Sequence, residues 1–166
     1  MENITKFEKV SISQYNQDLE KNDFKQLNSY EDIKLPKRAT KGSAGYDFYL
    51  PFDIILKPNE TILIPTGIRC KMNPNYVLMI FPRSSLGFKY RLMLNNTVGI
   101  IDSDYYNALN EGHIMIKVTN NSLENKTLEL KKGDAFAQGI FMVYGITCDD
   151  ETNEIRTGGF GSTNKQ

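Results

Sequence analysis

Residues 61–82, TILIPTGIRCKMNPNYVLMIFP, contain three short apolar runs in succession. The tripeptide PTG at 65–67 separates the first two runs, and it signals a turn or a bulge. Short runs that are rich in β-branched or aromatic residues, and that end at Gly, Pro or Asn, are typical of β-strands. This stretch therefore predicts consecutive β-strands.

The same pattern continues on both sides of this stretch, from Gly45 to residue 147. The further runs are YDFYLPFDIIL (46–56), YRLML (90–94), TVGIID (97–102), HIMIKVTNN (113–121), KTLEL (126–130) and AFAQGIFMVYGIT (135–147). Many short strands at regular spacing predict an all-β sandwich or barrel, such as a jelly roll. Strands and helices do not alternate, so a Rossmann or P-loop fold is disfavoured.

The first 34 residues are more polar than the rest of the chain and have a different pattern. Ser11 and Gln14 fit a capping box, and Tyr15 and Leu19 lie one helical turn apart. We therefore expect residues 1–34 to form a short, partly helical appendage. The β domain is expected over residues 35–150, and the Gly-rich residues 151–166 are expected to form a flexible lid.

Composition limits the classes of partner. The chain has 20 Lys and Arg against 20 Asp and Glu, so no basic excess predicts binding to nucleic acid or to an anionic membrane. No apolar run approaches the roughly 20 residues that span a bilayer.

Cys70 and Cys148 are the only cysteines, and they lack the spacing of a zinc site. They are most simply interpreted as reduced thiols of a cytoplasmic protein, and one disulfide between them is the alternative.

Arg83, Ser84 and Ser85 follow the apolar run that ends at Pro82. A guanidinium beside hydroxyl groups suits the oxygens of a phosphate. The alternative is a capped helix start or a solvated turn, and this segment alone favours that alternative.

Asp102 and Asp104 follow the apolar run VGII. A carboxylate at the end of a buried strand can orient an attacking water or hold Mg²⁺, and a continuing strand would put both carboxylates on one side. Tyr105 offers a flat ring that could pack on a sugar. The alternative for this segment is an Asp-rich turn between strands.

Gln138 lies inside an apolar run, where its amide must form hydrogen bonds either to the backbone or to a ligand. His113, the single histidine, has no nucleophile motif beside it, so a structural or surface role is expected.

Together these segments resemble the five motifs of the homotrimeric dUTP pyrophosphatases (dUTPases). The motifs appear in order from about Leu35 to the end of the chain, and the extended form is most similar to versions from low-GC Gram-positive bacteria and their phages. They are KGSAGYDFY (41–49), PRSSLGFK (82–89), NNTVGIIDSDYYN (95–107), KKGDAFAQGIF (131–141) and RTGGFGST (156–163).

The resemblance implies a jelly roll, a homotrimer with three shared active sites, and hydrolysis of dUTP to dUMP and pyrophosphate. Asp102 would orient and deprotonate the water that attacks the α-phosphorus. Asn96, with backbone groups near Gly99 and Met115, would read uracil, and Tyr105 would pack on the deoxyribose.

The remaining motif residues would handle the triphosphate. Phosphate oxygens would be held by Arg83, Ser84 and Ser85, with Gln138 reaching the α-phosphate region and Asp47 supporting the site. The lid would close with Arg156, Phe160, Gly161, Ser162 and Thr163. Mg²⁺ is expected on phosphate oxygens and water, with no direct protein ligand.

Three features depart from the family pattern. Ser85 stands where the family usually has glycine, YNALN (106–110) lengthens the turn after Tyr105, and one residue fewer separates Arg156 from GGF. Two other functions stay open: a dCTP deaminase on the same fold, for which Glu111 is the nearby glutamate, and a non-catalytic nucleotide sensor. A regulatory partner could bind the N-terminal appendage or the 106–110 insertion.

Overall fold

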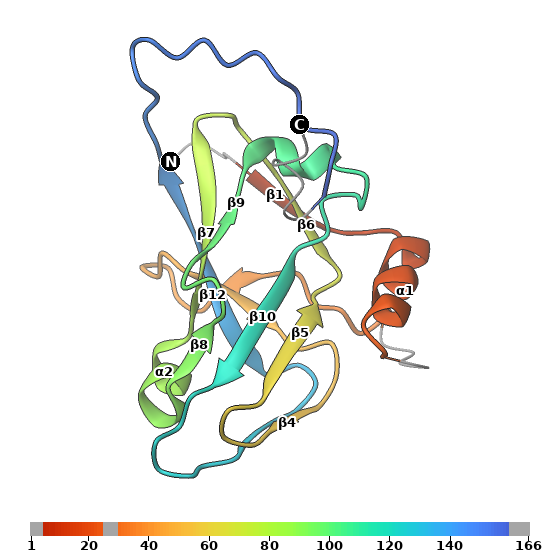
Figure 1. Cartoon of the computed structure of the whole chain (residues 1–166), viewed down its shortest axis with the longest axis vertical. Helices are drawn as coiled ribbons and strands as arrows, with labels where there is room; N and C mark the ends of the chain where they lie inside the picture. The colour runs from red at the N-terminus through yellow and green to blue at the C-terminus, as the bar shows by residue number, and fades with distance from the viewer. Residues whose placement is uncertain (1–4, 25–29, 160–166) are drawn as a thin grey trace.

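The chain folds mainly into β-strands, in a computed structural model that describes residues 5–24 and 30–159 (Figure 1). The strands are β1 (Thr5–Lys9), β2 (Lys37–Arg38), β3 (Tyr46–Tyr49), β4 (Ile54–Leu56), β5 (Thr61–Pro65), β6 (Ile68–Met72), β7 (Tyr76–Pro82), β8 (Leu92–Leu94), β9 (Gly99–Ile101), β10 (Met115–Asn120), β11 (Leu128–Leu130) and β12 (Ala135–Val143). The helices are α1 (Ile12–Lys21), α2 (Ser84–Tyr90) and the 3₁₀ helix η1 (Ser103–Asn107). The predicted all-β class is confirmed.

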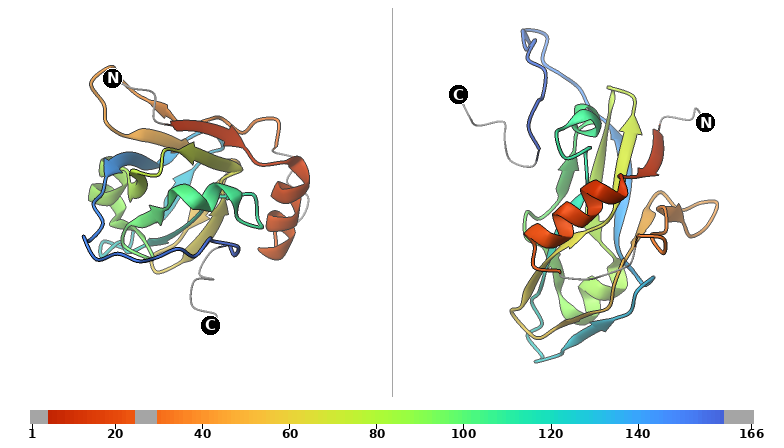
Figure 2. Two further views of the ribbon diagram at one scale, coloured as in Figure 1. Left: turned by 90° about the horizontal axis from the view of Figure 1, so that it is seen from above. Right: turned by 90° about the vertical axis from the view of Figure 1, so that its right-hand side faces the viewer.

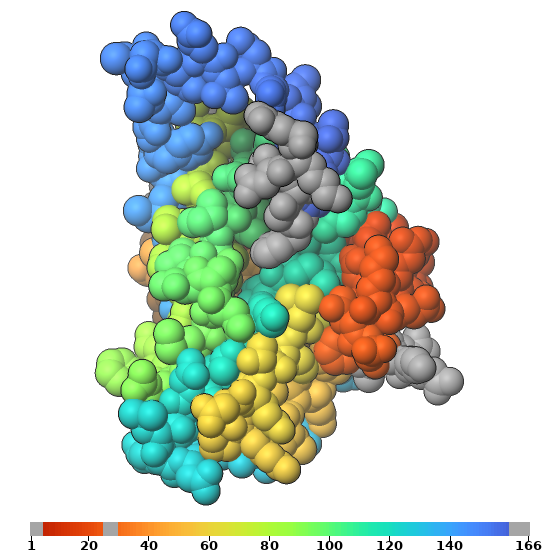
Figure 3. Space-filling view, viewed as in Figure 1, coloured from red at the N-terminus to blue at the C-terminus, as the bar shows by residue number. Residues whose placement is uncertain are grey.

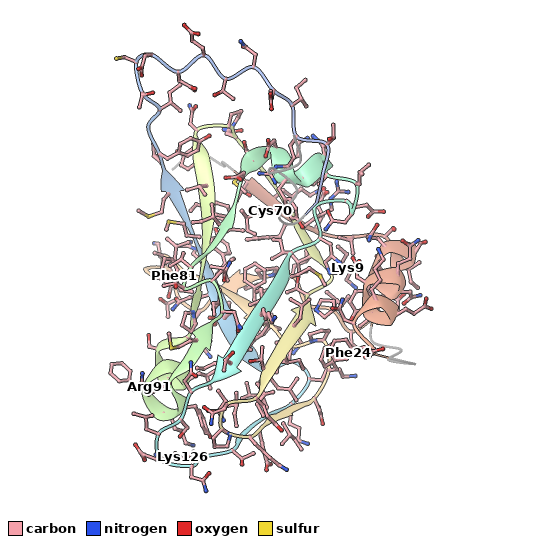
Figure 4. All side chains as sticks on the ribbon, viewed as in Figure 1. Lys9, Phe24, Cys70, Phe81, Arg91 and Lys126 are labelled. Atoms are coloured by element: carbon pink, nitrogen blue, oxygen red, sulfur yellow. The ribbon has the colours of Figure 1, made fainter. Side chains whose placement is uncertain are left out.

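The strands form several antiparallel sheets with jelly-roll-like packing. The largest has the order β2-β3-β12-β7-β9, and a second has the order β5-β10-β8. Two smaller ladders pair β1 with β6 and β4 with β11. Side chains fill the space between these layers, as Figure 4 shows around the labelled Cys70.

The stretch 61–82 forms three strands, as its pattern predicts, but they enter three different ladders. β5 pairs with β10, β6 pairs with β1, and β7 lies between β12 and β9. The turn at PTG contains Gly67 with φ of 74°, a left-handed conformation that favours glycine. A Cβ there would also lie 2.3 Å from Ile33 Cδ1. The turn therefore carries the chain from one layer to another.

The pleat of the five-stranded sheet separates an inner face from an outer face. Leu78 and Ile80 of β7 point into the core with exposed fractions of 0% and 1%, and Gly139 lies opposite Ile80. A Cβ on Gly139 would come within 2.8 Å of Leu78 Cδ1, so the close packing requires glycine. Met79 and Ile140, which alternate with these residues, point outward.

The N-terminal segment packs into the core. The ring of Phe7 on β1 lies 5.4–5.8 Å from the rings of Tyr46, Phe48 and Phe141. The sequence did not indicate β1, because TKFEK has a single large apolar residue. The predicted cap of α1 is confirmed, since Ser11 Oγ accepts a hydrogen bond from the Gln14 N–H at 3.1 Å.

Cys70 and Cys148 are both free thiols. Burial raises the pKa of the Cys70 thiol to about 12, whereas Cys148 is exposed. Within residues 5–24 and 30–159, no helix combines the length and the apolar character needed to cross a membrane.

We expect Phe7→Ala to lower the free energy of unfolding by about 3–5 kcal/mol, because it removes a buried ring from an aromatic cluster. Urea denaturation at a fixed protein concentration measures this change. Ile12→Ala is the control, since Ile12 belongs to the same segment but is 52% exposed. Equal effects of the two substitutions would show that β1 is not part of the cooperative core.

Candidate functional site

Several predicted phosphate-binding residues line one cavity of about 500 Å³, here called the polar cavity. Its walls are Ala39, Ser43, Ala44, Gly45, Asp47, Arg83, Ser84, Ser85, Gln138 and Ile140. Arg83 is the N-cap of α2, and Ser84 and Ser85 form its first turn. The helix start that the segment alone favoured is therefore present, and it lies on the cavity wall.

The cation and the amide of the polar cavity are held by groups from neighbouring strands. Arg83 Nε lies 3.2 Å from Asp47 Oδ1, and the Arg83 side chain keeps 38% of its surface exposed. Gln138 Nε2 donates to the Pro82 carbonyl at 3.2 Å. A Cβ on Gly45 would stand 2.5 Å from Gln138 Oε1, so glycine leaves room for the amide.

The predicted uracil-reading residues line a second cavity of about 240 Å³, here called the apolar pocket. Its walls are Leu63, Ile80, Leu94, Asn95, Asn96, Gly99, Ile101, Ile114, Met115, Ile116 and Lys117. The turn before β9 is closed by backbone bonds from Thr97 N to Leu94 O at 3.0 Å and from Val98 N to Asn96 O at 2.7 Å. Asn96, Gly99 and Met115 are thus brought together.

Asp102 and Asp104 meet at Arg156, which comes from the far end of the chain. Arg156 donates from Nη2 to Asp102 Oδ2 at 2.7 Å and from Nε to Asp104 Oδ1 at 2.9 Å. The strand does not continue through them, because β9 ends at Ile101 and η1 begins at Ser103, so the pleat does not align the two carboxylates. The two carboxylates are instead held close together by the Arg156 guanidinium, which donates a hydrogen bond to each of them.

The segment between β12 and Arg156 leaves the sheet and returns to η1, which Figures 1 and 2 show as the blue trace. Tyr144 holds its beginning, since its hydroxyl donates to Pro74 O at 2.6 Å. The predicted lid residues Phe160, Gly161, Ser162 and Thr163 lie outside the described residues.

Tyr105 is buried beside these carboxylates, with 4% of its surface exposed. Its hydroxyl donates to His113 O at 2.8 Å and accepts from Asn110 Nδ2 at 2.8 Å. Burial is the main reason that the pKa of Tyr105 is raised, so the phenol stays protonated. The Arg156 guanidinium lies 5.8 Å from the ring centroid.

His113 and Glu111 have structural contacts. His113 is fully buried; Nε2 accepts from the Gly67 N–H at 2.8 Å, and Nδ1 lies 2.6 Å from Asp18 Oδ2. Glu111 accepts from Ser11 N and Ser11 Oγ, both at 2.7 Å, and these bonds lower the pKa of its carboxyl. Glu111 therefore caps α1. Its carboxylate, which a deaminase would need for catalysis, is already hydrogen-bonded to Ser11.

The polar cavity and the apolar pocket involve opposite faces of the five-stranded sheet. Asp47 lies opposite Gln138 across the β3–β12 ladder, and both point outward. Ile80 lies opposite Gly99 across the β7–β9 ladder, and both point inward. Directly opposed residues share a face and successive residues alternate, so one chain divides its candidate site between the two faces.

Sequence reasoning missed Gly45 as a site residue and Asp18 as a partner of His113. Gly45 could have been found, because it adjoins Asp47 in the first motif. Asp18 gave no signal, since its partner is 95 residues away. Over the described parts of the chain, no three His, Cys, Asp or Glu side chains gather as a metal site.

Known proteins are similar to this chain in sequence and in fold. Residues 31–164 match the sequence profile of the dUTPase family. The deoxyuridine 5'-triphosphate nucleotidohydrolase of Lactococcus lactis is 44% identical over 134 residues, which cover 79% of this chain and 88% of that protein.

Solved structures agree with these sequence matches. The crystal structure of the Streptococcus mutans dUTPase has a TM-score of 0.64 and 34% identity, covering 85% of this chain and 97% of that one. The structure of a mutant dUTPase from phage phi11 of S. aureus has the same fold, with a TM-score of 0.65 at 20% identity over 92% of this chain and 98% of that one. Ordered motifs, fold and relatives lead to one conclusion: this chain belongs to the dUTPase family.

Proposed function

We propose that this protein hydrolyses dUTP to dUMP and pyrophosphate, by attack of water on the α-phosphorus. The observation that carries the proposal is the position of Asp102, which directly follows Ile101 in the wall of the apolar pocket. A base held in that pocket would place its phosphates near this carboxylate. The reaction would limit uracil in DNA and supply dUMP for dTMP synthesis, and the cytoplasm is its proposed location.

Recognition of the nucleoside is assigned to the apolar pocket and Tyr105. Asn96 offers an amide, and the backbone near Gly99 and Met115 offers N–H and C=O groups, for the edge of uracil. These groups would reject cytosine by their donor and acceptor pattern, and the limited space would reject the thymine methyl. Tyr105 would lie against the deoxyribose and leave no room for a 2′-hydroxyl.

Recognition of the phosphates is assigned to the polar cavity. Arg83 and the hydroxyls of Ser84 and Ser85 are charged and neutral donors, and the partly exposed guanidinium can meet phosphate oxygens without leaving Asp47. Gln138 would reach the α-phosphate region. Phosphoryl transfer depends chiefly on positioning and charge neutralisation, which this donor set can supply.

Asp102 is the proposed general base. In the described structure its carboxylate is paired with Arg156. We assign Arg156 to the γ-phosphate when the nucleotide is bound, which would release Asp102 to orient and deprotonate water. The lid residues 160–163 would then cover the uracil and the terminal phosphates.

The residues fit Mg²⁺ bound through the triphosphate. Asp47, Ser84 and Ser85 supply oxygen atoms at the polar cavity, and Mg²⁺ usually keeps several waters while binding one or two carboxylates and substrate phosphates. Asp47 would accept hydrogen bonds from those waters. The ion would neutralise charge on the phosphate oxygens.

Three copies of the chain are proposed to share the sites. A nucleotide in the apolar pocket lies across the sheet from the polar cavity of the same chain, so a second copy would bring a polar cavity to it. The outer face of the sheet has an apolar row where such a copy could pack. Ile140 on β12 lies opposite Met79 on β7, and Met79 lies opposite Ile100 on β9. Ile100 and Met142 are 52% and 48% exposed in the single chain.

The proposed function is tested by pyrophosphate release from dUTP, UTP, dCTP and dTTP in the presence of Mg²⁺. We expect rapid release from dUTP and little from the other three nucleotides. Comparable hydrolysis of dCTP, or none of dUTP, would refute the proposal. Binding of dUTP without release would instead identify a nucleotide sensor.

Asp102→Asn should retain nucleotide binding while kcat falls about 10²–10⁴-fold, because the amide cannot accept the proton of water. Calorimetry with a non-hydrolysable dUTP analogue measures binding, and steady-state kinetics measures turnover. Asp104→Asn is the matched control, since it removes the other carboxylate that contacts Arg156. Unchanged turnover in Asp102→Asn would require a different base.

Gly45→Ala should displace the Gln138 amide and lower kcat/KM for dUTP about tenfold to a hundredfold, as expected for misplacement of a positioning group by about 1 Å. The fold should persist, because the clash falls on the end of a flexible side chain. Gly42→Ala in the same loop is the control, since a Cβ there meets nothing within 4 Å. Equal activity of the two variants would remove Gln138 from the proposed site.

A further inference from the structure

The N-terminal segment bonds to the turn after Tyr105, which the 106–110 insertion lengthens. Here the brace denotes residues 5–21, which comprise β1 and α1, and the long turn denotes residues 105–113. Figure 1 shows α1 at the side of the molecule where β10 begins. Three hydrogen-bonded links join these segments, and each spans about 100 positions of sequence.

The first two links lie near the surface. Tyr106 Oη donates to Glu8 Oε2 at 2.5 Å, and the Arg69 guanidinium covers the Tyr106 ring at 3.7 Å from its centroid. At the second link, Ser11 donates from both N and Oγ to Glu111. The capping box of α1 is therefore completed by a glutamate of the long turn, in place of Gln14.

The third link is buried. His113 Nε2 accepts from the Gly67 N–H, so the proton of the neutral ring is on Nδ1 and is donated to Asp18 Oδ2 at 2.6 Å. Gln14 Nε2 donates to the same oxygen at 2.9 Å. Although burial raises the pKa of Asp18, these hydrogen bonds lower it overall, and the group is a carboxylate at neutral pH.

The long turn connects His113 to Tyr105 and to the apolar pocket, where the nucleoside is proposed to bind. Tyr105 donates its hydroxyl proton to the carbonyl of His113, and Gly112 packs so tightly that a Cβ would lie 2.5 Å from Tyr105 O. Directly after His113, Ile114 and Met115 line the apolar pocket. A shift of His113 would therefore move both Tyr105, which is proposed to contact the sugar, and Met115, whose backbone is proposed to contact the base.

Helix α1 also forms part of the wall beside the apolar pocket. Gln14, Gln17, Asp18 and Lys21 line a cavity of about 390 Å³ that shares Leu63 and Met115 with that pocket. Figure 3 shows α1 against the surface formed by β5 and β10. The brace is thus next to the proposed nucleoside site as well as bonded to its turn.

We infer that Asp18 and His113 are positioning residues that fix Tyr105, so that the brace sets the preference for deoxyribose over ribose. This inference rests on the proposed function, because it assigns Tyr105 to the sugar. A purely structural brace would affect the folding stability and leave the preference between the two sugars unchanged. The preference is therefore the quantity that distinguishes the two roles.

The test compares kcat/KM for dUTP and UTP in Asp18→Ala. We expect the dUTP-to-UTP ratio to fall about tenfold, with KM for dUTP raised and kcat changed less, since one partner of a buried hydrogen bond is lost. Asp18→Asn keeps an oxygen that can accept from His113 and should restore most of the ratio. Glu20→Ala, which removes an exposed carboxylate from the same helix, is the control.

Glu111→Ala is a second variant for the case in which Asp18→Ala does not fold, because its link to Ser11 lies at the surface. The ratio should fall in the same direction, about threefold, since these bonds are partly solvated. Thermal unfolding of each variant measures stability separately. A lowered melting temperature with an unchanged ratio in the variants that fold would overturn the inference.

Binding of dUMP and UMP by calorimetry separates this inference from the proposed function. A wild-type chain that prefers dUMP, together with variants that keep the same preference, would overturn the inference alone. A wild-type chain that binds neither nucleotide would overturn both proposals. Loss of the preference in Asp18→Ala, with recovery in Asp18→Asn, would support the positioning role.

Discussion

The pleat of β12 is the constraint on which the rest of the structure depends. Gly139 faces inward, and the absence of a side chain lets Leu78 and Phe48 pack against the strand. Gln138, one position earlier, must then face outward into the polar cavity, where it bonds Pro82 O. A shift of one residue would bury the amide in the core and remove this partner, at a cost in stability. The close packing at Gly139 and the outward position of the Gln138 amide therefore both follow from the alternation of side chains along β12.

The same alternation places the polar cavity and the apolar pocket on different faces of the sheet in one chain. The polar cavity opens on the outer face of the sheet, and the apolar pocket uses the inner side of its edge strand, β9. Under the proposed function, a second copy of the chain would bring a polar cavity to a nucleotide held in the apolar pocket. The apolar row that ends at the exposed Ile100 offers a surface on which such a copy could pack. The geometry of the sheet therefore supports the proposed assembly.

Buried polar groups in this protein are connected across long sequence distances. Asp18 and His113 satisfy each other inside the core, and Gly67 completes the bonding of the imidazole. Arg156 joins the chain end to Asp102 in a similar manner, but at a more exposed site. Because an unpaired buried donor or charge is costly, such groups hold their segments in place. Both links converge on the short region that includes η1 and the start of β10.

The sequence by itself determined most strands of the β domain from their apolar runs, the cap of α1 from Ser11, and the family from five ordered motifs, because these signals are local. It did not determine that β5 and β6 enter different ladders, since partner choice depends on which distant strands bury each face. It left open whether Asp102 and Asp104 lie on one side of a continuing strand or in a turn, and the end of β9 at Ile101 decided this. The pairing of Asp18 with His113, 95 residues apart, required the tertiary structure. Propensity and periodicity act over a few residues, whereas the layout of this site depends on contacts between segments that only folding brings together.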